Sequence, residues 1–208
     1  MSTYITAIVA GPYEGTTATL TSSDGRTIDL GVYARASIVE HLDAEEIIEI
    51  TRQGFEFFEG AYGIAYPFTK YDQIFVPEYN AGAMENAGCV TFRDAYVFRT
   101  RPTEAQMEAR ANTILHELAH MWFGDLVTMK WWNDLWLNES FAEFMSHLAL
   151  VEATKYTEGW TGFMVRKDWG LKQDQLPTTH PITAEIRDLA DVEVNFDGIT
   201  YAKGASVL

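Results

Sequence analysis

Two histidines four residues apart are the first residues in this sequence whose types and spacing could do chemistry. His116 and His120 enclose Glu117 in the segment HELAH. In a helix of 3.6 residues per turn, the two imidazoles project from the same face and can share one small cation. Zinc suits such ligands, and a catalytic zinc needs a third protein ligand and one open position for water. The segment therefore predicts part of a metal site.

The third ligand should be a carboxylate. The single cysteine, Cys89, excludes an internal disulfide and a thiolate-rich zinc site. The region after the motif offers Glu139, Glu143 and Glu152. Glu139 lies near the start of the next predicted helix, where a short turn back could bring it against the histidines. Spacing alone leaves Glu143 open as well.

Glu117 stands where it could accept a proton from water activated by the metal, because zinc can lower the pKa of water to about 7. The two together would make a hydrolytic nucleophile at neutral pH. The alternative is a chance match, in which the histidines are ordinary core or surface residues. A capped helix under the motif and an acid-bearing helix after it favour the metal site.

The elements that must position these residues are helices. Thr103 and Gln106 form a capping box that predicts a helix over residues 103–123, which carries HELAH. Apolar periodicity predicts further helices over residues 133–155 and 157–169. An irregular, proline-containing stretch should follow.

The first half of the chain predicts strands. Residues 3–35 read as short strands with a hairpin turn at Asp24-Gly25. A helix, N-capped by Asp43, should end at Gly60, and strands should cover residues 71–76 and 89–98. Strands first and helices second indicate an α+β fold, with an N-terminal mixed β-sheet followed by a helical part.

Composition removes several classes of function. The 208 residues carry 15 Lys and Arg against 30 Asp and Glu, a net charge of -15, so a surface for nucleic acid or anionic lipid is missing. The sequence has no stretch of roughly 20 apolar residues that could span a membrane. The N-terminus also lacks the pattern of a signal peptide. We therefore expect a cytoplasmic protein without nucleic-acid partners.

Four motifs in order carry a resemblance to a known family. HELAH is followed after 18 residues by Glu139 in LWLNESFAEF, preceded by GAMENAG, and followed by ITYAKGASVL. This pattern resembles the gluzincin aminopeptidases of the aminopeptidase N type. The resemblance implies a thermolysin-like (gluzincin) catalytic domain carrying HExxH-x18-E. It also implies one Zn²⁺ per chain, held by His116, His120 and Glu139, with Glu117 as general base.

The resemblance also assigns an exopeptidase loop, which consists of Gly82, Ala83, Met84, Glu85 and Asn86. Glu85 would bind the free α-amino group of the substrate through charge-assisted hydrogen bonds. Tyr201 would donate a hydrogen bond to the oxyanion, an interaction worth about 10²- to 10³-fold in rate. Without the family, GAMENAG reads as an ordinary hairpin loop, and Tyr201 is one of ten tyrosines.

The implied function is zinc-dependent hydrolysis of the N-terminal peptide bond of peptides with a free amine. Residues 1–10 would be the terminal strand of an N-terminal β-domain, and residues 11–208 a partial catalytic domain. The rest of that β-domain and a C-terminal domain would be its partners, so we expect feeble activity from this chain alone. The alternatives are an epoxide hydrolase of the leukotriene hydrolase type and a non-catalytic scaffold, which would not need all these residues together.

Overall fold

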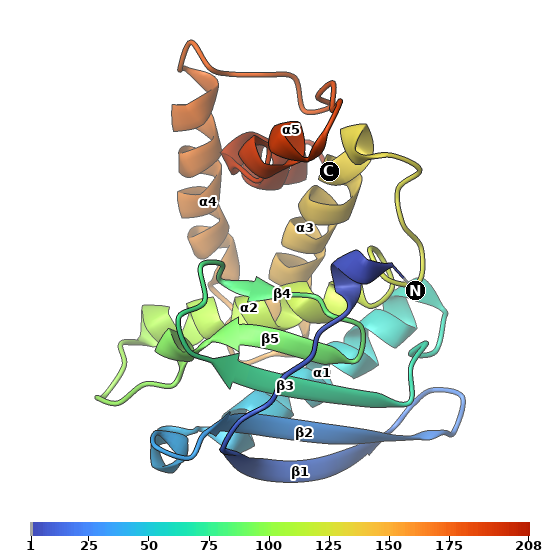
Figure 1. The fold of residues 1–208 in the computed structure, drawn as a ribbon, viewed down its shortest axis with the longest axis vertical. Coiled ribbons are helices and arrows are strands. Elements are labelled where there is room, and N and C mark those ends of the chain that lie inside the picture. The colour runs from blue at the N-terminus through green and yellow to red at the C-terminus, as the bar shows by residue number, and fades with distance from the viewer. Residues whose placement is uncertain (1) are drawn as a thin grey trace.

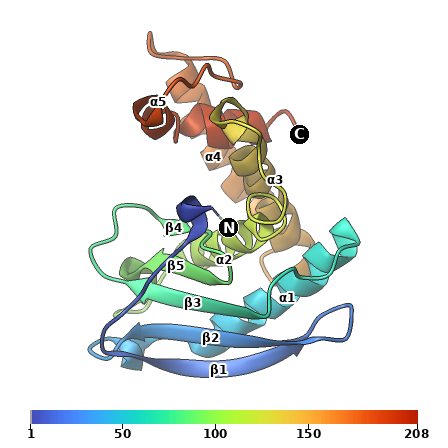
Figure 2. The same ribbon diagram turned by 45° about the vertical axis from the view of Figure 1, so that its right-hand side comes forward.

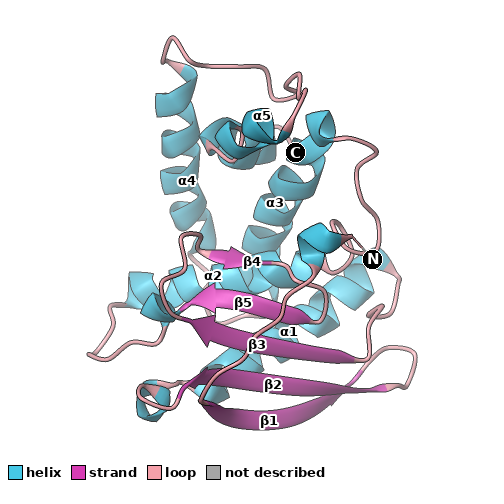
Figure 3. Ribbon diagram, viewed as in Figure 1, coloured by secondary structure: helices cyan, strands magenta, loops and turns pink. Residues whose placement is uncertain are grey.

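A mixed sheet followed by a group of helices makes up the part of the chain that the structure describes, residues 2–208 of a computed structural model. Figure 3 shows the strands gathered in one sheet and most of the helices of the second half rising from it. The α+β arrangement predicted from the sequence is therefore confirmed.

The sheet contains five strands in the order β1-β2-β3-β5-β4 (Figure 1). Strands β1 (Tyr13–Thr21) and β2 (Thr27–Arg35) form the predicted antiparallel hairpin. Strand β3 (Lys70–Val76) is parallel to both β2 and β5 (Cys89–Arg93). The short strand β4 (Ala83–Met84) pairs with β5 in the antiparallel direction and ends the sheet. The sheet thereby carries residues 82–86, which we call the GAMEN segment, on its edge.

Four long helices accompany the sheet, namely α1 (Ala44–Tyr62), α2 (Glu104–His120), α3 (Leu135–Ala153) and α4 (Gly159–Asp174). Helices α1 and α2 cover one face of the sheet, and α3 and α4 extend away from it (Figures 1 and 2). The capping box at Thr103 is present on α2, as predicted. Helix α1 runs past Gly60 and ends at Gly63, whose left-handed φ of 64° stops the helix there.

The core lies between the sheet and the helices α1 and α2. Its largest fully buried side chains combine aromatic rings and branched aliphatic groups, including Phe58, Tyr66, Tyr71, Phe75, Phe92, Leu115 and Trp122. Trp122 lies two residues beyond the end of α2, and its indole N–H donates to the backbone oxygen of Ile64 at 2.9 Å. The C-terminal end of α2, which carries HELAH, is therefore held rigidly against the core.

Two further local predictions differ from the structure. Asp43 makes no capping hydrogen bond, because its carboxylate accepts a hydrogen bond from the buried guanidinium of Arg110 at 2.7 Å. The strand predicted over residues 89–98 ends at Arg93, where a 3-10 turn (Asp94–Tyr96) begins. Other 3-10 turns cover Val39–His41 and Trp132–Asp134.

Within residues 2–10, where the sequence predicts the terminal strand of an N-terminal β-domain, the chain forms a 3-10 turn (Thr3–Ile5) and no strand. A strand needs a neighbouring backbone along its length, and here Ala87 N–H donates to Ile5 O without a ladder. The ring of Tyr4 instead packs edge-on against Trp132, with ring centroids 5.2 Å apart. The assignment of residues 1–10 to a separate domain stays a prediction.

The sequence after α4 is less irregular than expected. Residues 178–204, which we call the tyrosine segment, contain a short helix α5 (Leu189–Val194) and a π-helical turn (Ile199–Lys203). This segment returns to pack between α3 and α4 (Figures 1 and 2). It thereby brings Tyr201 back to the HELAH helix.

Candidate metal centre

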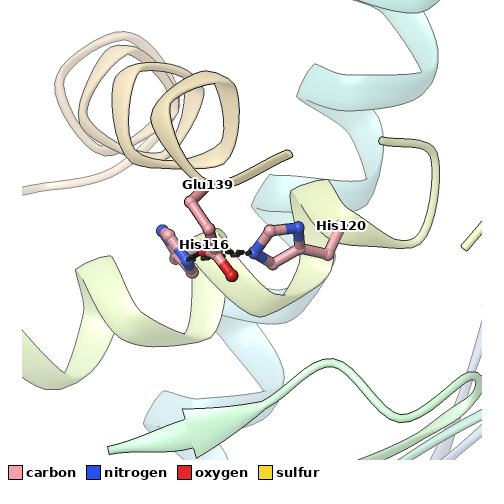
Figure 4. A group of neighbouring side chains, drawn as sticks. All are labelled: His116, His120 and Glu139. Carbon is pink, nitrogen blue, oxygen red and sulfur yellow. Dashed lines mark hydrogen bonds and ion pairs between the residues drawn. The ribbon is translucent and has the colours of Figure 1, made fainter. Parts of the chain in front are cut away.

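Helices α2 and α3 bring three donor atoms to one point (Figure 4). The Nε2 atoms of His116 and His120 lie 3.0 Å apart, and each lies 3.3 Å from Oε2 of Glu139. The histidines occupy successive turns of α2, and Glu139 lies in the second turn of α3. All three side chains are buried. The helix geometry predicted from the spacing is present, and the three residues form a donor set that can hold a metal ion.

The structure separates the three glutamates that spacing left open. Glu143 forms a two-pronged ion pair with Arg166, from Nε to Oε1 at 2.8 Å and from Nη2 to Oε2 at 3.1 Å. Glu152 is exposed to solvent. Glu139 is the one whose oxygen meets both Nε2 atoms, whereas Oε2 of Glu143 lies 3.7 Å from Nδ1 of His116, on the opposite side of that ring.

The ring of His120 is oriented by its neighbours. Its Nδ1–H faces the side-chain oxygen of Asn138 at 2.8 Å and the backbone oxygen of Phe123 at 2.9 Å. Donation from Nδ1 leaves the lone pair of Nε2 for a cation. Gly124 makes room for this contact, because a Cβ there would lie 2.6 Å from the Asn138 oxygen. Its φ of 141° also suits glycine.

The charges around the three donors favour a cation. Burial opposes a charge on His120, but the carboxylates of Glu85 and Glu139 outweigh it and raise the pKa of its imidazole. Burial alone would raise the pKa of Glu139, but the two imidazoles hold it below its usual range. Burial, together with Glu85 and Glu139, raises the pKa of Glu117 despite the opposing effect of His120. The site thus concentrates buried acids that a positive ion would stabilise.

The GAMEN segment lies against these acids. Glu85 directly follows β4 and is buried, and its carboxylate groups with Glu117 and His120, the three ligand atoms lying within 4.8 Å of one another. The Asn138 amide donates to Glu85 Oε1 at 3.5 Å. Asn86 accepts a hydrogen bond from Thr91 at 2.9 Å. The segment is therefore a fixed edge strand that presents one carboxylate to the candidate metal centre.

Three more residues of this segment shape its backbone. The carbonyl of Gly82 accepts a hydrogen bond from Arg93 N–H at 3.0 Å. Ala83 and Met84 are β4 itself and pair with Phe92 and Thr91 of β5. They tie the segment to the sheet. The side of β4 that faces away from β5 has no neighbouring strand within residues 2–208.

Tyr201 reaches the same centre from the tyrosine segment. Its ring stacks on His116, with centroids 6.0 Å apart and an angle of 20° between the planes. Burial, with the carboxylates of Glu139 and Glu85, raises the pKa of the phenol well above its usual value. The phenol therefore keeps its proton at neutral pH and can act as a donor.

Sequence reasoning missed Arg166, which neutralises Glu143 beside His116. The two residues are 23 positions apart on different helices, so spacing offers no signal for this pair. His147 lies buried on α3, where its Nδ1–H donates to Glu143 O at 2.8 Å. Among residues 2–208, no helix combines the length and the apolar character that a membrane crossing requires.

Comparison with known proteins agrees with this geometry. The peptidase family M1 domain matches residues 46–208. The chain belongs to peptidase family M1. It is 60% identical to aminopeptidase N of Streptomyces lividans and 42% identical to tricorn protease-interacting factor F2 of Thermoplasma acidophilum, both over its whole length. It is also 45% identical, over 77% of its length, to leucyl aminopeptidase of Saccharolobus solfataricus.

Membership in this family accounts for the thermolysin-like arrangement of a sheet followed by ligand-bearing helices. The chain spans about a quarter of the length of the first two relatives, 24% and 26%. A metallopeptidase family and a buried set of two imidazoles and a carboxylate together indicate a metal site.

Proposed function

We propose that this chain carries the catalytic centre of a zinc-dependent aminopeptidase, which hydrolyses the N-terminal peptide bond of peptides with a free amine. The observation that carries the proposal is the meeting of His116, His120 and Glu139 at distances of 3.0 and 3.3 Å. Relatives named as aminopeptidases support it.

The donor set suits zinc in particular. Two ligand atoms of a tetrahedral zinc lie about 3.3 Å apart when each is about 2.0–2.1 Å from the ion. The three measured separations are close to that value. Zinc held by these residues would supply a Lewis acid that polarises a peptide carbonyl and makes water acidic near neutral pH.

Glu117 is the residue proposed to move the proton. Its Oε2 is buried and has no hydrogen-bond partner within residues 2–208, so it is free to accept one. Burial raises the pKa of this carboxyl above that of a free glutamate, which favours uptake of a proton. Glu117 would take a proton from the attacking water and pass it to the leaving amine.

Glu85 and Tyr201 would select and stabilise the reacting bond. A substrate ammonium group bound to the Glu85 carboxylate would lie beside the donor set, because this carboxylate lies close to Glu117 and His120. The fixed separation between the Glu85 carboxylate and the metal would place the first peptide bond at the metal. The edge strand β4 could pair with the substrate backbone as an added strand, and Tyr201 would donate to the oxyanion.

Metal binding by the purified chain tests the donor set. We expect one zinc per chain by elemental analysis after dialysis, and loss of that zinc in His120→Ala. Lys172→Ala is the matched control, because Lys172 pairs with Asp168 on the solvent face of α4. Absence of bound zinc in the wild type, or retention in His120→Ala, would overturn the proposal.

Amine selectivity tests the exopeptidase assignment. Because feeble turnover is expected from this chain, binding of an α-amino hydroxamate to the zinc-loaded chain is the measurement, with the N-acetylated compound as control. We expect Glu85→Ala to weaken binding of the free amine about 10- to 100-fold and to leave the acetylated compound unchanged. Equal binding of both compounds to the wild type would exclude an aminopeptidase and favour another hydrolase or a scaffold.

A further inference from the structure

The π-helical turn that carries Tyr201 begins at a carboxylate with two separate tasks. One oxygen of Asp197, Oδ1, accepts hydrogen bonds from the backbone N–H groups of Ile199 and Thr200, each at 3.0 Å. The backbone oxygen of Asp197 accepts a hydrogen bond from Tyr201 N–H, also at 3.0 Å. Asp197 therefore binds three consecutive N–H groups of the turn that carries the proposed oxyanion donor.

The other oxygen of this carboxylate is held by a histidine. Oδ2 of Asp197 lies 2.9 Å from Nε2 of His180, and Nδ1 of the same ring lies 2.7 Å from the backbone oxygen of Pro181. Both ring nitrogens face oxygen acceptors, so the imidazole is fixed in orientation at both ends. His180 in turn fixes the direction in which the carboxylate of Asp197 points.

The two sides of the turn are tied to neighbouring helices. The Ser140 hydroxyl on α3 donates to Thr200 O, and the side-chain oxygen of Gln173 on α4 accepts a hydrogen bond from Gly198 N–H. Lys203, at the end of the turn, pairs with Asp174 at 2.7 Å. The sides of the turn are thus set by helices, and its beginning is set by Asp197. π-helical turns occur frequently at functional sites.

We propose that Asp197, held by His180, is a positioning residue that aims the Tyr201 hydroxyl at the oxyanion. This inference rests on the proposed function. Asp197 reaches His180, Ile199 and Thr200 through its side chain, and within residues 2–208 none of its hydrogen bonds or ion pairs involves the three metal donors. Its effect on the reaction must therefore pass through the turn.

Loss of the Asp197 carboxylate would affect the position of the Tyr201 hydroxyl, and an oxyanion donor acts only at hydrogen-bond distance. A displacement of about 1 Å can cost about 100-fold in rate. Without the carboxylate, two N–H groups at the start of the turn lose their acceptor, and the turn can rewind to regular helical spacing. That change would rotate the ring of Tyr201 away from His116.

The first test compares ligands on the zinc-loaded full chain. A phosphinic dipeptide analogue with a free amine mimics the tetrahedral oxyanion, and the free amino acid mimics the product. We expect Asp197→Ala to weaken the phosphinic analogue about 10- to 100-fold and to leave the amino acid unchanged. Asp197→Asn should restore most of the affinity, because the amide oxygen can still cap the turn. Equal weakening of both ligands would overturn the inference.

A double-mutant cycle with Tyr201→Phe separates this inference from the function on which it rests. We expect Asp197→Ala to have little further effect once the hydroxyl is gone. Two outcomes would refute the positioning role and leave the oxyanion role intact. In the first, Asp197→Ala weakens the phosphinic analogue equally in both backgrounds. In the second, Tyr201→Phe weakens it and Asp197→Ala does not. If Tyr201→Phe binds the phosphinic analogue like the wild type, the oxyanion role fails, and the inference fails with it.

A measurement that needs neither metal nor activity completes the test. In the metal-free chain, hydrogen exchange at the amides of Ile199 and Thr200 should speed up in Asp197→Ala. Asp188→Ala is the matched control, because Asp188 caps the nearby helix α5 through Asp191 N–H at 3.0 Å and, within residues 2–208, makes no hydrogen bond to the turn. Unchanged exchange in Asp197→Ala would contradict the inference.

Discussion

The ligand helices and the tyrosine segment bring side chains to the same centre by different means. Helices α2 and α3, 17 and 19 residues long, present His116, His120 and Glu139 from regular backbone packed on the core. The tyrosine segment contains one six-residue helix and a π-helical turn, and polar contacts to α3 and α4 hold that turn.

This difference teaches where precision comes from in each half of the site. In the ligand helices, the helical repeat sets the spacing of the donors, and burial of large apolar side chains holds the helices in place. In the tyrosine segment, a few hydrogen bonds and close approaches to glycine add to the burial of apolar side chains such as Ile199 and Ala202, which lie outside the main apolar core. We therefore expect the ligand helices to keep the positions of the metal donors when a single polar group is lost, and the tyrosine segment to shift its side chains.

The largest expected effect tests whether the ligand helices keep their geometry when the proposed general base is removed. Glu117→Gln should abolish the turnover of an aminoacyl reporter, which we expect to be feeble in the wild-type chain, because an amide cannot accept the proton. Zinc content should stay at one per chain, because Glu117 is outside the donor set of the three converging residues. Loss of zinc in this variant would mean that Glu117 is a ligand or a structural residue and would break the comparison.

The next effect tests whether the ligand helices depend on one ionic contact. Arg166→Met leaves the buried carboxylate of Glu143 without its guanidinium. We expect a loss of about 2–3 kcal/mol in the free energy of unfolding of the metal-free chain by urea titration. This lies below the usual range for buried pairs, because the side chain of Arg166 is 41% exposed to screening solvent.

The matched control for that variant is Arg187→Met, which removes an exposed ion pair with Asp191. It should change the free energy of unfolding by less than about 1 kcal/mol. Similar values for the two variants would show that the contact between Arg166 and Glu143 contributes no more than a surface pair. The ligand helices would then rest on apolar packing alone, which would sharpen the contrast with the tyrosine segment.

A glycine in the tyrosine segment provides the third prediction. A Cβ on Gly204 would lie 1.9 Å from Oγ of Ser140 and 2.9 Å from its Cβ, so Gly204→Ala must push α3 and the π-helical turn apart. We expect a loss of about 1–3 kcal/mol in unfolding free energy. Gly60→Ala in α1 is the control, because no heavy atom lies within 4 Å of its position, and it should be neutral or slightly stabilising.

The smallest effect concerns the start of the HELAH helix. Thr103→Ala removes the capping box of α2 and should cost about 1 kcal/mol in unfolding free energy. Zinc affinity, measured by competition with a chelator, should not change, because the ligands lie at the opposite end of the helix. A change in zinc affinity would show that the ligand helices transmit small displacements as the tyrosine segment is expected to do.

The same contrast explains what the sequence could predict. The two histidine donors and the helix that carries them follow from the spacing of His116 and His120 and from the capping box, because both are local patterns. The choice of Glu139 over Glu143 needed the family resemblance, since the ion pair of Glu143 with Arg166 joins two helices and leaves no local pattern. The cap that Asp43 was expected to provide failed for the same reason, because Arg110 occupies its carboxylate.

Tyr201 marks the limit of prediction from residues alone. The turn that carries it is fixed by contacts from Ser140, Gln173 and His180. These three residues lie between 21 and 61 positions before Tyr201 in the chain. No periodicity in the segment itself encodes these contacts.

Anomalous X-ray diffraction at the zinc edge, on crystals of the zinc-loaded chain, tests the central claim most directly. The account predicts one strong peak about 2.0–2.2 Å from Nε2 of His116, Nε2 of His120 and a carboxylate oxygen of Glu139. A peak bound instead by Glu143, or no peak between the two imidazoles at full zinc loading, would contradict it.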